Sequence, residues 1–323
     1  MFEKKRVMIT GGTGSYGNML TEILLEEHKP EQIVIYSRGE HKQGEMQRKF
    51  GDLNIMRYFI GDVRDLDRLK LAMHGVDYVF HAAALKVVPT CEYNPSEAVQ
   101  TNVIGTQNVI TACLDTGVKR ALYIGTDKAV APINLYGATK LCAEKLFIAA
   151  NQYAGKEGTI FGCLRYGNVI NSNGSVVPLF KKQKETGCIT ITDKQMTRFM
   201  IRLEEAVRFS VKALEDMYGG EVFIPKIPSV YILEVAKSIA PDCKVKEIGI
   251  RPGEKLHEML FSREESRRVV DDGDRYIMVP DKYPTGNYKG FKPKNGQNWQ
   301  LFDYSSDGNK DWLCEEDIKK LME

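Results

Sequence analysis

The first half of the chain alternates short apolar runs with longer segments in which apolar residues recur every three to four positions. The short runs predict buried strands, and the longer segments predict helices with one apolar face. Regular alternation of the two is typical of a parallel sheet covered by helices on both faces. The predicted strands are residues 6–10, 32–36, 57–61, 77–82, 120–125 and 159–166, and the predicted helices are residues 16–27, 65–73, 95–116 and 135–152.

The alternation ends after the sixth strand, where a loop rich in Gly, Asn and Ser begins ("GNVINSNGS"). A helix near residues 177–186 and shorter elements follow, and the stretch "DKYPTGNYKGFKPKNG" predicts a loop. We therefore expect an α/β fold, with a Rossmann-like doubly wound parallel sheet over residues 1–167. A smaller, mainly substrate-binding lobe is expected over residues 168–323. A segment near residues 202–225, ending in the apolar run "EVFIP", is predicted to return to the first sheet.

Composition and charge narrow the class of protein. The chain has 323 residues, with 45 basic against 43 acidic side chains, so no general field attracts nucleic acid or an anionic membrane. No apolar run approaches the ~20 residues that span a bilayer, and the first strand leaves no room for a signal peptide, which predicts a soluble, cytoplasmic protein. The seven cysteines form no CxxC pair and the five histidines are far apart, so we expect reduced thiols and no metal site.

The segment "TGGTGSYG" places Gly11, Gly14 and Gly17 between the first strand and the first helix. In dinucleotide-binding folds the first glycine makes the turn, the second lets the backbone approach a pyrophosphate, and the third lets helix and strand pack closely. The N–H groups of the helix N-terminus then bind the phosphates. A glycine motif alone is weak evidence for a dinucleotide site, but the position of this motif between a strand and a helix disfavours a chance glycine loop.

The end of the second predicted strand indicates which dinucleotide binds. NAD-binding proteins usually have an acid there, whereas this chain has "YSRGEHK", in which Ser37, Arg38 and Lys42 can surround a 2′-phosphate. NADP is therefore favoured; the alternative is a solvated, charged turn. After the third strand, "GDVRD" offers Asp62 and Val63 to the adenine.

The YxxxK pattern occurs twice, as Tyr136 with Lys140 and as Tyr288 with Lys292. The second pair lies in the predicted Pro- and Gly-rich loop, and we assign it no chemistry. The first pair begins a predicted helix, where residues four apart share a face. A phenol with a pKa of about 10 becomes a base near neutral pH only when cations stabilise the phenolate. Lys140 and an oxidised nicotinamide are expected to supply that charge, so that Tyr136 removes a hydroxyl proton as hydride leaves the same carbon.

The glycine motif and the Tyr136/Lys140 pair resemble those of the extended short-chain dehydrogenase/reductases. From Thr10 to about Glu258 the chain is similar to one branch, the inverting UDP-N-acetylglucosamine 4,6-dehydratases, in the segments "AAALKVV", "EYNPSEAVQTNVIGT", "TDKAVAPINLYGATK", "RYGNV", "MTRFM" and "RPGEKLHE". The resemblance implies conversion of UDP-GlcNAc to UDP-2-acetamido-2,6-dideoxy-β-L-arabino-hex-4-ulose, for pseudaminic acid or surface polysaccharide biosynthesis. It also implies a tightly bound NADP that is recycled in each turnover, and a homo-oligomer, either dimer or hexamer.

In the mechanism that the resemblance implies, Tyr136 takes the C4 hydroxyl proton and NADP⁺ takes the C4 hydride, which makes the C5 hydrogen acidic. Asp127, held protonated, donates to the leaving C6 hydroxyl, and the hydride then returns to C6. Lys128 stands where retaining dehydratases have a glutamate base, and the resemblance associates it with inversion at C5. A lysine can act as a base when desolvation or neighbouring cations lower its pKa. The alternative is a surface lysine that merely pairs with Asp127.

The predicted sites can now be stated together. The catalytic residues are Thr126, Asp127, Lys128, Tyr136 and Lys140. The cofactor-binding residues are Gly11, Thr13, Gly14, Ser15, Tyr16, Gly17, Ser37, Arg38, Lys42, Asp62, Val63, Ala82, Ala83, Lys86, Asn102, Tyr136, Lys140 and Val169. The resemblance assigns substrate contacts to Lys86, Thr126, Asn168, Arg251 and Glu254, of which the Arg fork suits a diphosphate and the Glu suits ribose hydroxyls. Arg198 receives no role, a structural salt bridge being the alternative.

Two other functions stay open on the same fold. A retaining dehydratase or a sugar-nucleotide epimerase would share fold and cofactor and differ in the C5 stereochemistry or in whether C6 loses its oxygen. A non-catalytic NADP-sensing protein is the third reading, because a fold alone does not give a function. The complete Thr126, Asp127, Tyr136 and Lys140 set argues against the sensor, which would not need it.

Overall fold

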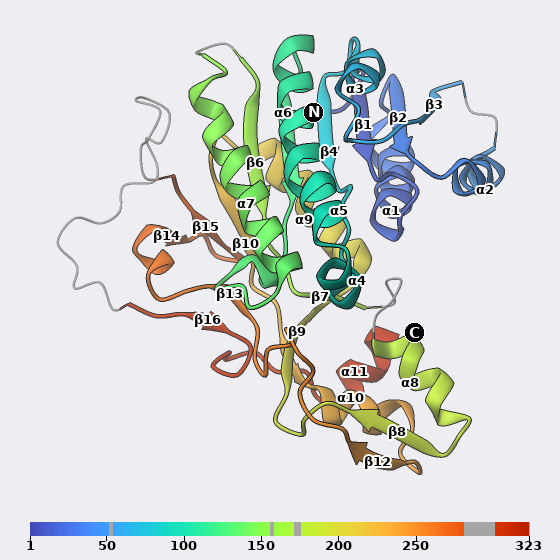
Figure 1. Ribbon diagram of the computed structural model, residues 1–323, viewed down its shortest axis with the longest axis vertical. Coiled ribbons are helices and arrows are strands. Elements are labelled where there is room, and N and C mark those ends of the chain that lie inside the picture. The colour runs from blue at the N-terminus through green and yellow to red at the C-terminus, as the bar shows by residue number, and fades with distance from the viewer. Residues whose placement is uncertain (52–53, 156–157, 171–175, 281–300, 323) are drawn as a thin grey trace.

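The structure is a computed structural model that describes residues 1–51, 54–155, 158–170, 176–280 and 301–322. The predicted loop at residues 281–296, with its Tyr288 and Lys292, lies outside the described residues, as do residues 171–175 of the Gly/Asn/Ser loop. Figure 1 shows an upper part built around a large sheet and a smaller lower part. Among the described helices, none is long and apolar enough to cross a membrane.

The described part of the chain contains a nine-stranded sheet in the order β14-β15-β10-β6-β5-β4-β1-β2-β3. The strands from β3 through β10 in this order run parallel, whereas β15 is antiparallel to β10 and β14 is antiparallel to β15. This is a Rossmann-like sheet, as the sequence predicts. Its strands are β1 (Arg6–Thr10), β2 (Gln32–Ser37), β3 (Met56–Ile60), β4 (Tyr78–His81), β5 (Arg120–Ile124), β6 (Ile160–Leu164), β10 (Val222–Pro225), β14 (Val269–Asp271) and β15 (Arg275–Met278).

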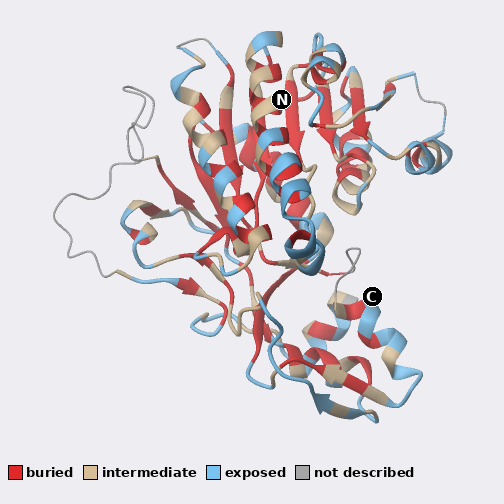
Figure 2. Ribbon diagram, in the orientation of Figure 1, coloured by how far each residue is buried: buried red, intermediate tan, exposed pale blue. Residues whose placement is uncertain are grey.

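Helices cover both faces of the sheet, and Figure 2 shows buried residues along the strands and on the inward sides of these helices. One face carries α3 (Leu66–Met73), α6 (Gly105–Thr116) and α7 (Leu135–Ala149), and the other carries α1 (Ser15–Ile23) and α9 (Leu203–Asp216). A π-helical turn, η1 (Leu24–His28), extends α1, and a 3₁₀ turn, η4 (Ala150–Gln152), extends α7. The predicted helices at 16–27, 65–73 and 135–152 are confirmed with these bounds.

Two helical regions differ from the prediction. The helix expected over 95–116 is divided into α5 (Pro95–Val99), a π-helical turn η2 (Gln100–Ile104) and α6. Helix α2 (Glu40–Phe50) was not predicted, because "EHKQGEMQRKF" contains too few apolar residues to show a helical stripe. Lys42, predicted to help surround a 2′-phosphate, therefore lies in the first turn of α2 with an exposed side chain. A second unpredicted helix, α4 (Val88–Tyr93), precedes α5.

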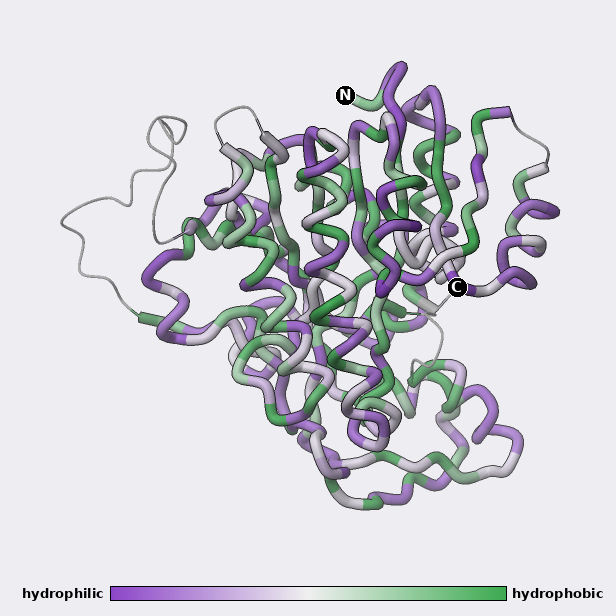
Figure 3. The backbone as a smooth tube through the Cα atoms, turned by 45° about the horizontal axis from the view of Figure 1, so that its top comes forward, coloured by the Kyte–Doolittle hydropathy of each residue, from purple (hydrophilic) through white to green (hydrophobic). Residues whose placement is uncertain are grey.

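The lower part has its own apolar core, between α8 (Val176–Lys184), α10 (Ile232–Ile239), α11 (Glu315–Met322) and small sheets. In Figure 3 the helices of both parts alternate hydrophobic and hydrophilic residues. The small sheets of this part contain β7 (Asn168–Val169), β9 (Thr197–Ile201) and β11 (Ser229–Tyr231), and β8 (Cys188–Ile191) and β12 (Lys244–Glu247). A further pair, β13 (Met259–Phe261) and β16 (Tyr304–Ser305), packs Phe261 and Tyr304 into the same apolar core as the main sheet. The run predicted to return to the main sheet is β10, parallel to β6. The domain boundary at 167/168 stays a prediction.

Candidate functional site

The glycine turn after β1 forms an open cradle. Gly11 has φ +69°, and a Cβ there would lie 2.9 Å from the backbone of Ala83. A Cβ on Gly17 would lie 2.2 Å from the carbonyl oxygen of Gly12, so α1 can pack on the turn only with glycine at this position. Gly14 is the N-cap of α1 and has no side chain to accept from the first N–H groups of the helix, so these groups require another partner. These features fit a dinucleotide pyrophosphate.

Of the other predicted residues in this turn, Thr13 and Ser15 flank Gly14, and Tyr16 turns away from it. The Tyr16 hydroxyl lies 2.6 Å from the hydroxyl of Ser210 on α9, so its side chain joins α1 to α9. Asn102 lies in the π-helical turn η2 and forms two hydrogen bonds with the main chain of Leu85, at 2.8 and 2.9 Å. It therefore fixes the "HAAALK" loop, which carries Ala82, Ala83 and Lys86; a π-helical turn at such a position is common in functional sites.

The end of β2 presents a cation, Arg38, rather than an acid, and an acid, Asp62, follows β3. The Ser37 hydroxyl accepts from the amide of Gln43 at 3.0 Å. The Arg38 side chain is 57% exposed and lies 4.0 Å from the Asp62 carboxylate, which also accepts from Arg64 at 2.7 Å. Partial burial raises the pKa of Asp62, but the hydrogen bonds from Arg64 outweigh it and lower the pKa overall. Arg38 thus offers an exposed guanidinium beside the position where a ribose phosphate would lie.

Tyr136 and Lys140 lie one turn apart on α7 and are both buried. Burial raises the pKa of Tyr136 to about 12, against the lowering effects of Lys128 and of the Thr126 hydroxyl. Lys140 donates to the carbonyl of Ile124 at 2.7 Å, and burial lowers the pKa of its ammonium to about 7. The cation that lowers the pKa of Tyr136 is therefore Lys128, whereas the sequence suggested Lys140.

The N-terminus of α7 is built to bring Tyr136 against the turn η3 (Asp127–Ala129). The side chain of Asn134 caps the helix by accepting from the amide of Gly137 at 2.7 Å. A Cβ on Gly137 would lie 2.2 Å from the carbonyl oxygen of Lys128, so only glycine permits this close approach. The tyrosine and the acid–lysine pair thus share one end of the sheet, where α/β folds bind ligands.

Asp127 and Lys128 form a close ion pair on η3. Oδ1 of Asp127 accepts from Nζ of Lys128 and from the hydroxyl of Thr126, each at 2.9 Å. Oδ2 is buried and has no hydrogen-bond partner within the described residues. A fully buried carboxylate with one vacant oxygen suits a ligand hydroxyl.

The surroundings of Lys128 correct one expectation. Besides Asp127, its Nζ lies 3.4 Å from Oδ1 of Asn168 and 3.6 Å from Oε1 of Glu258. Burial lowers the pKa of Lys128, but the two carboxylates outweigh burial and raise the pKa above its ordinary value. The sequence interpretation that the pKa of Lys128 is lowered overall is therefore wrong, because carboxylates rather than cations lie closest and outweigh desolvation. Lys128 is not an ordinary surface residue, since its side chain is only 25% exposed.

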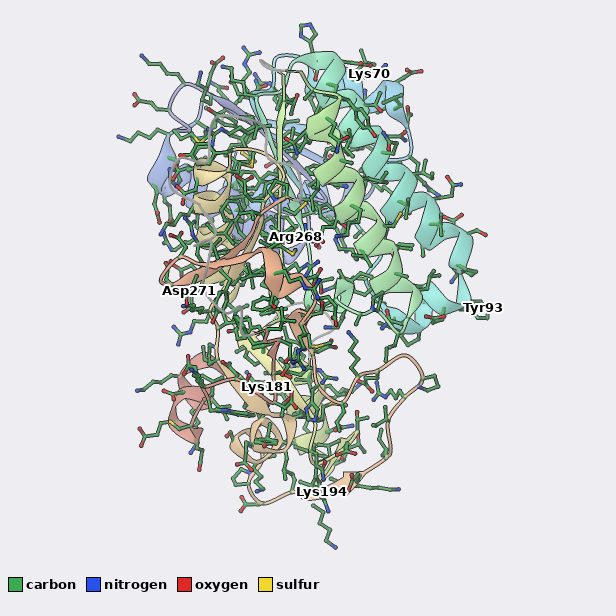
Figure 4. The ribbon with its side chains drawn as sticks, turned by 90° about the vertical axis from the view of Figure 1, so that its left-hand side faces the viewer. Lys70, Tyr93, Lys181, Lys194, Arg268 and Asp271 are labelled. Carbon is green, nitrogen blue, oxygen red and sulfur yellow. The ribbon has the colours of Figure 1, made fainter. Side chains whose placement is uncertain are left out.

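The segment "RPGEK" lies against the N-terminus of α7. The amide of Asn134 donates to the carbonyl of Gly253 at 2.7 Å, and Lys255 donates to the carbonyl of Val130 at 2.5 Å. Arg251 is exposed and Glu254 is half-buried. Val169 follows Asn168 on β7, which pairs in parallel with β9. Figure 4 shows the side chains from the side, with Tyr93 on the upper part and Lys181 and Lys194 on the lower part.

Arg198, which received no role from the sequence, is buried on β9. Its guanidinium donates to the carbonyls of Thr197 at 2.7 Å, Leu256 at 3.0 Å and Lys255 at 2.9 Å. It therefore fixes the segment that follows "RPGEK".

With the geometry established, comparisons with known proteins identify the family. The family described as "Polysaccharide biosynthesis protein" matches residues 7–280. The chain belongs to this family. It is 50% identical over 329 residues to a UDP-N-acetylglucosamine 4,6-dehydratase (inverting) of Campylobacter jejuni subsp. jejuni serotype O:2, covering 100% of this chain and 98% of the relative. It is also 39% identical over 330 residues to a UDP-glucose 4-epimerase of Rickettsia canadensis, covering 100% and 96%.

Two solved structures are similar to this chain in fold. Pen from Bacillus thuringiensis superimposes with a TM-score of 0.90 at 39% identity, covering 100% of this chain and 98% of that chain. DesIV from Streptomyces venezuelae, a dTDP-glucose 4,6-dehydratase solved with NAD and TYD bound, has a TM-score of 0.69 at 21% identity, covering 78% and 86%. The second likeness shows the fold alone.

Sequence reasoning did not assign Glu258 and Lys255, which contact the Asp127–Lys128 region. Both lie within "RPGEKLHE", a segment already noted for its similarity to the family, but no spacing rule places them beside residues about 130 positions earlier. Glu92 was also missed; its carboxylate accepts from the amide of Leu135 at 2.7 Å and so ties α4 to the start of α7.

Proposed function

We propose that this protein is a C5-inverting UDP-N-acetylglucosamine 4,6-dehydratase that uses NADP. The observation that carries the proposal is the buried Asp127–Lys128 pair beside Tyr136, in a chain 50% identical over its whole length to a relative of that name. The product would be the 4-keto-6-deoxy sugar nucleotide with inverted C5. A homo-oligomeric, cytoplasmic enzyme that serves pseudaminic acid or surface polysaccharide biosynthesis remains the accompanying prediction.

The glycine cradle of Gly11, Gly14 and Gly17 would hold the dinucleotide, and Ser37 with Arg38 would surround the 2′-phosphate of NADP. The exposed Arg38 guanidinium and the absence of an acid at the end of β2 support NADP over NAD. The dinucleotide would supply reversible hydride transfer, from C4 and back to C6, so the reaction would need no net oxidant.

The residues on α7 perform the first proton transfer. Tyr136 accepts the C4 hydroxyl proton, helped by the positive charge of Lys128 and by the neighbouring Thr126 side chain, both of which lower its pKa. Lys140 donates to the Ile124 carbonyl at 2.7 Å, and burial lowers the pKa of its ammonium to about 7; with the dinucleotide bound it would donate to a ribose hydroxyl. The 4-ketone that results makes the C5 hydrogen acidic.

Asp127 and Lys128 perform the loss of water. The ion pair has the same number of protons as a neutral lysine beside a protonated aspartic acid, and one proton moved along the 2.9 Å hydrogen bond interconverts them. In the neutral form, Lys128 accepts the C5 proton while Asp127 donates its proton to the leaving C6 hydroxyl. Water departs and leaves the pair in its ionic form, which the raised pKa of Lys128 favours.

The substrate would be held from the second lobe. The guanidinium of Arg251 suits the diphosphate, and the carboxylate of Glu254 suits ribose hydroxyls. Both residues lie on the segment that contacts α7 through the hydrogen bond between Asn134 and Gly253. Asn168 lies beside Lys128 and can contact the sugar or the diphosphate. Lys86, whose pKa is lowered by burial and by Lys128, follows the cofactor loop.

An epimerase is the second candidate, because relatives from Rickettsia carry the name UDP-glucose 4-epimerase at 39–41% identity. Epimerisation at C4 needs a tyrosine base and a nicotinamide but no acid for a leaving C6 hydroxyl. The vacant, buried Oδ2 of Asp127 favours dehydration, since an epimerase has no step that uses it.

Incubating the protein with UDP-GlcNAc in D₂O and following products by proton NMR tests the proposal. We expect a 4-keto-6-deoxy product with deuterated, inverted C5; retained C5 or a C4 epimer would refute inversion or dehydration respectively. Lys128→Ala should lose dehydration by at least ~100-fold while binding NADP normally. Lys194→Ala, an exposed lysine of the lower part (Figure 4), serves as the control and should behave as wild type. Near-normal turnover by Lys128→Ala would remove Lys128 from the mechanism.

A further inference from the structure

Glu258 is a buried carboxylate next to the proposed catalytic pair. The residue is only 3% exposed and lies directly before β13. Ser306 fixes its main chain from both sides, because its amide donates to the Glu258 carbonyl at 2.8 Å and its hydroxyl accepts from the Glu258 amide at 3.0 Å. The side chain therefore projects from a rigid strand end rather than from a surface loop.

The carboxylate of Glu258 faces Lys128. Its Oε1 lies 3.6 Å from the Nζ of Lys128, and its Oε2 lies 3.7 Å from the Nζ of Lys255. Within the described part of the chain, Oε2 has no hydrogen-bond partner. Burial raises the pKa of this carboxyl group, against the effect of Lys128. A buried carboxylate with incomplete hydrogen bonding is costly for folding, so its position needs a reason beyond stability.

The proton balance of water loss supplies that reason. The C5–H bond breaks and its electron pair forms the C5–C6 double bond, the C6–O bond breaks, and the Asp127 proton leaves with the hydroxyl as water. Lys128 changes from neutral to positive in this step. We propose that Glu258 is a positioning residue for dehydration, which holds the Lys128 amine at C5 and stabilises the ammonium formed when Lys128 takes the C5 proton. The inference rests on the proposed function and adds a residue to it.

The titratable and charged groups that face Lys128 determine whether its pKa rises or falls when Glu258 is replaced. They come from η3, α7, β9, the segment before β13 and the loop after β4: Asp127, Tyr136, Arg198, Glu258, Lys255 and Lys86. Two of these are carboxylates and three are cations. Removing the Glu258 charge leaves Asp127 as the one carboxylate of this group, so the pKa of Lys128 should fall.

Glu258→Gln tests the inference, because glutamine keeps the size of the side chain and removes its charge. The matched control is Glu247→Gln, which removes an exposed carboxylate 3.7 Å from Lys194 in the lower part. The measurements are kcat and KM for UDP-GlcNAc across pH 6 to 10, the absorbance of reduced nicotinamide during turnover, NADP affinity and the melting temperature.

We expect kcat of Glu258→Gln to fall at least ~10-fold with KM and NADP affinity nearly unchanged. The fall in kcat at high pH, which reports loss of the proton from the Lys128–Asp127 pair, should move to lower pH by about one to three units. Reduced nicotinamide should accumulate, since oxidation at C4 continues while water loss slows. Glu258→Asp should recover part of kcat, because it restores the charge.

Each outcome decides the inference. A Glu258→Gln enzyme with the kcat and pH profile of the Glu247→Gln control would overturn it. A lower kcat with an unmoved pH limb, no accumulated reduced nicotinamide and a lower melting temperature would also overturn it, in favour of a structural role. Failure of the wild-type protein to form any dehydrated product would instead overturn the proposed function, and the inference with it.

Discussion

Replacing Arg165 tests the buried ionic contact that supports α7. Arg165 is completely buried, and its Nε and Nη2 each donate to one oxygen of Glu144 at 2.7 Å. The remaining N–H groups donate to both oxygens of Glu265, at 2.8 and 3.1 Å, and to the carbonyl of Leu260 at 3.1 Å. All five guanidinium donors are therefore used, which joins β6 to α7 and to the segment after β13.

The magnitude follows from this donor count. Lysine has three donors, so Arg165→Lys loses at least two charge-assisted bonds, each worth about 1.5 kcal/mol, and should destabilise by ~3 kcal/mol. Arg165→Met leaves the fully buried Glu144 without its nearest cation, and breaking such a pair costs about 3–5 kcal/mol. The Glu144→Gln/Arg165→Met double variant removes the uncompensated charge as well. It should therefore be more stable than Arg165→Met alone.

Urea unfolding followed by circular dichroism measures these differences as changes in the free energy of unfolding at constant m-value. Arg208→Met is the matched control, because Arg208 also pairs with two carboxylates, Glu27 and Glu204, but its side chain is 46% exposed. Exposed pairs contribute little, so this variant should unfold almost as wild type. If Arg165→Met lost less than ~1 kcal/mol, or the double variant were the least stable of the set, the reasoning from buried charge would be refuted.

Two further predictions concern packing and pH. Gly137→Ala should lower kcat by ~100-fold, because its Cβ would lie 2.2 Å from the carbonyl oxygen of Lys128 and must displace the reacting groups; Gly44→Ala in α2, where a Cβ meets nothing nearer than 3.7 Å, is the control and should keep full activity. Full activity in Gly137→Ala would contradict this account of the close approach. Burial lowers the pKa of His81 from 6.5 to about 3, so the unfolded chain takes up this proton before the folded one as pH falls from 6.5 towards 3. The contribution of neutral His81 to the free energy of unfolding is therefore complete above pH 6.5. About 2 kcal/mol of this contribution should be lost between pH 8 and pH 5. Unfolding free energies of wild type and His81→Gln across this range measure the difference, and equal pH slopes would exclude the effect.

The apolar runs and the glycine motif predicted most of the upper part, because both patterns are local. A buried parallel strand is a continuous apolar run, and the turn after β1 tolerates only glycine at Gly11 and Gly17, so each leaves a mark in the sequence. The Tyr136/Lys140 spacing likewise follows from helical geometry. Helix α2 could not be predicted this way, since it rests only Gln43 and Met46 against the protein and shows no apolar stripe.

The charged surroundings of Lys128 could not be predicted from local pattern. The sequence places Asp127 next to Lys128, but Glu258 reaches the pair only through the packing of β13 against η3. Burial lowers the pKa of Lys128, whereas the carboxylates of Asp127 and then Glu258 raise it, so the structure gives a raised pKa where the sequence suggested a lowered one. The sequence places the first carboxylate beside Lys128, but only the folded structure brings the second one there.

One short segment joins substrate binding to the proposed chemistry. Residues 251–258 carry the predicted nucleotide contacts Arg251 and Glu254 at one end and Glu258 at the other. Between them, Gly253 accepts from Asn134, the residue that also caps α7. A displacement of this segment would therefore move the helix start that carries Tyr136 and, through Glu258, the amine of Lys128. Because misplacement of reacting groups by about 1 Å can cost ~100-fold in rate, the same contacts that hold the nucleotide also determine whether the base meets C5.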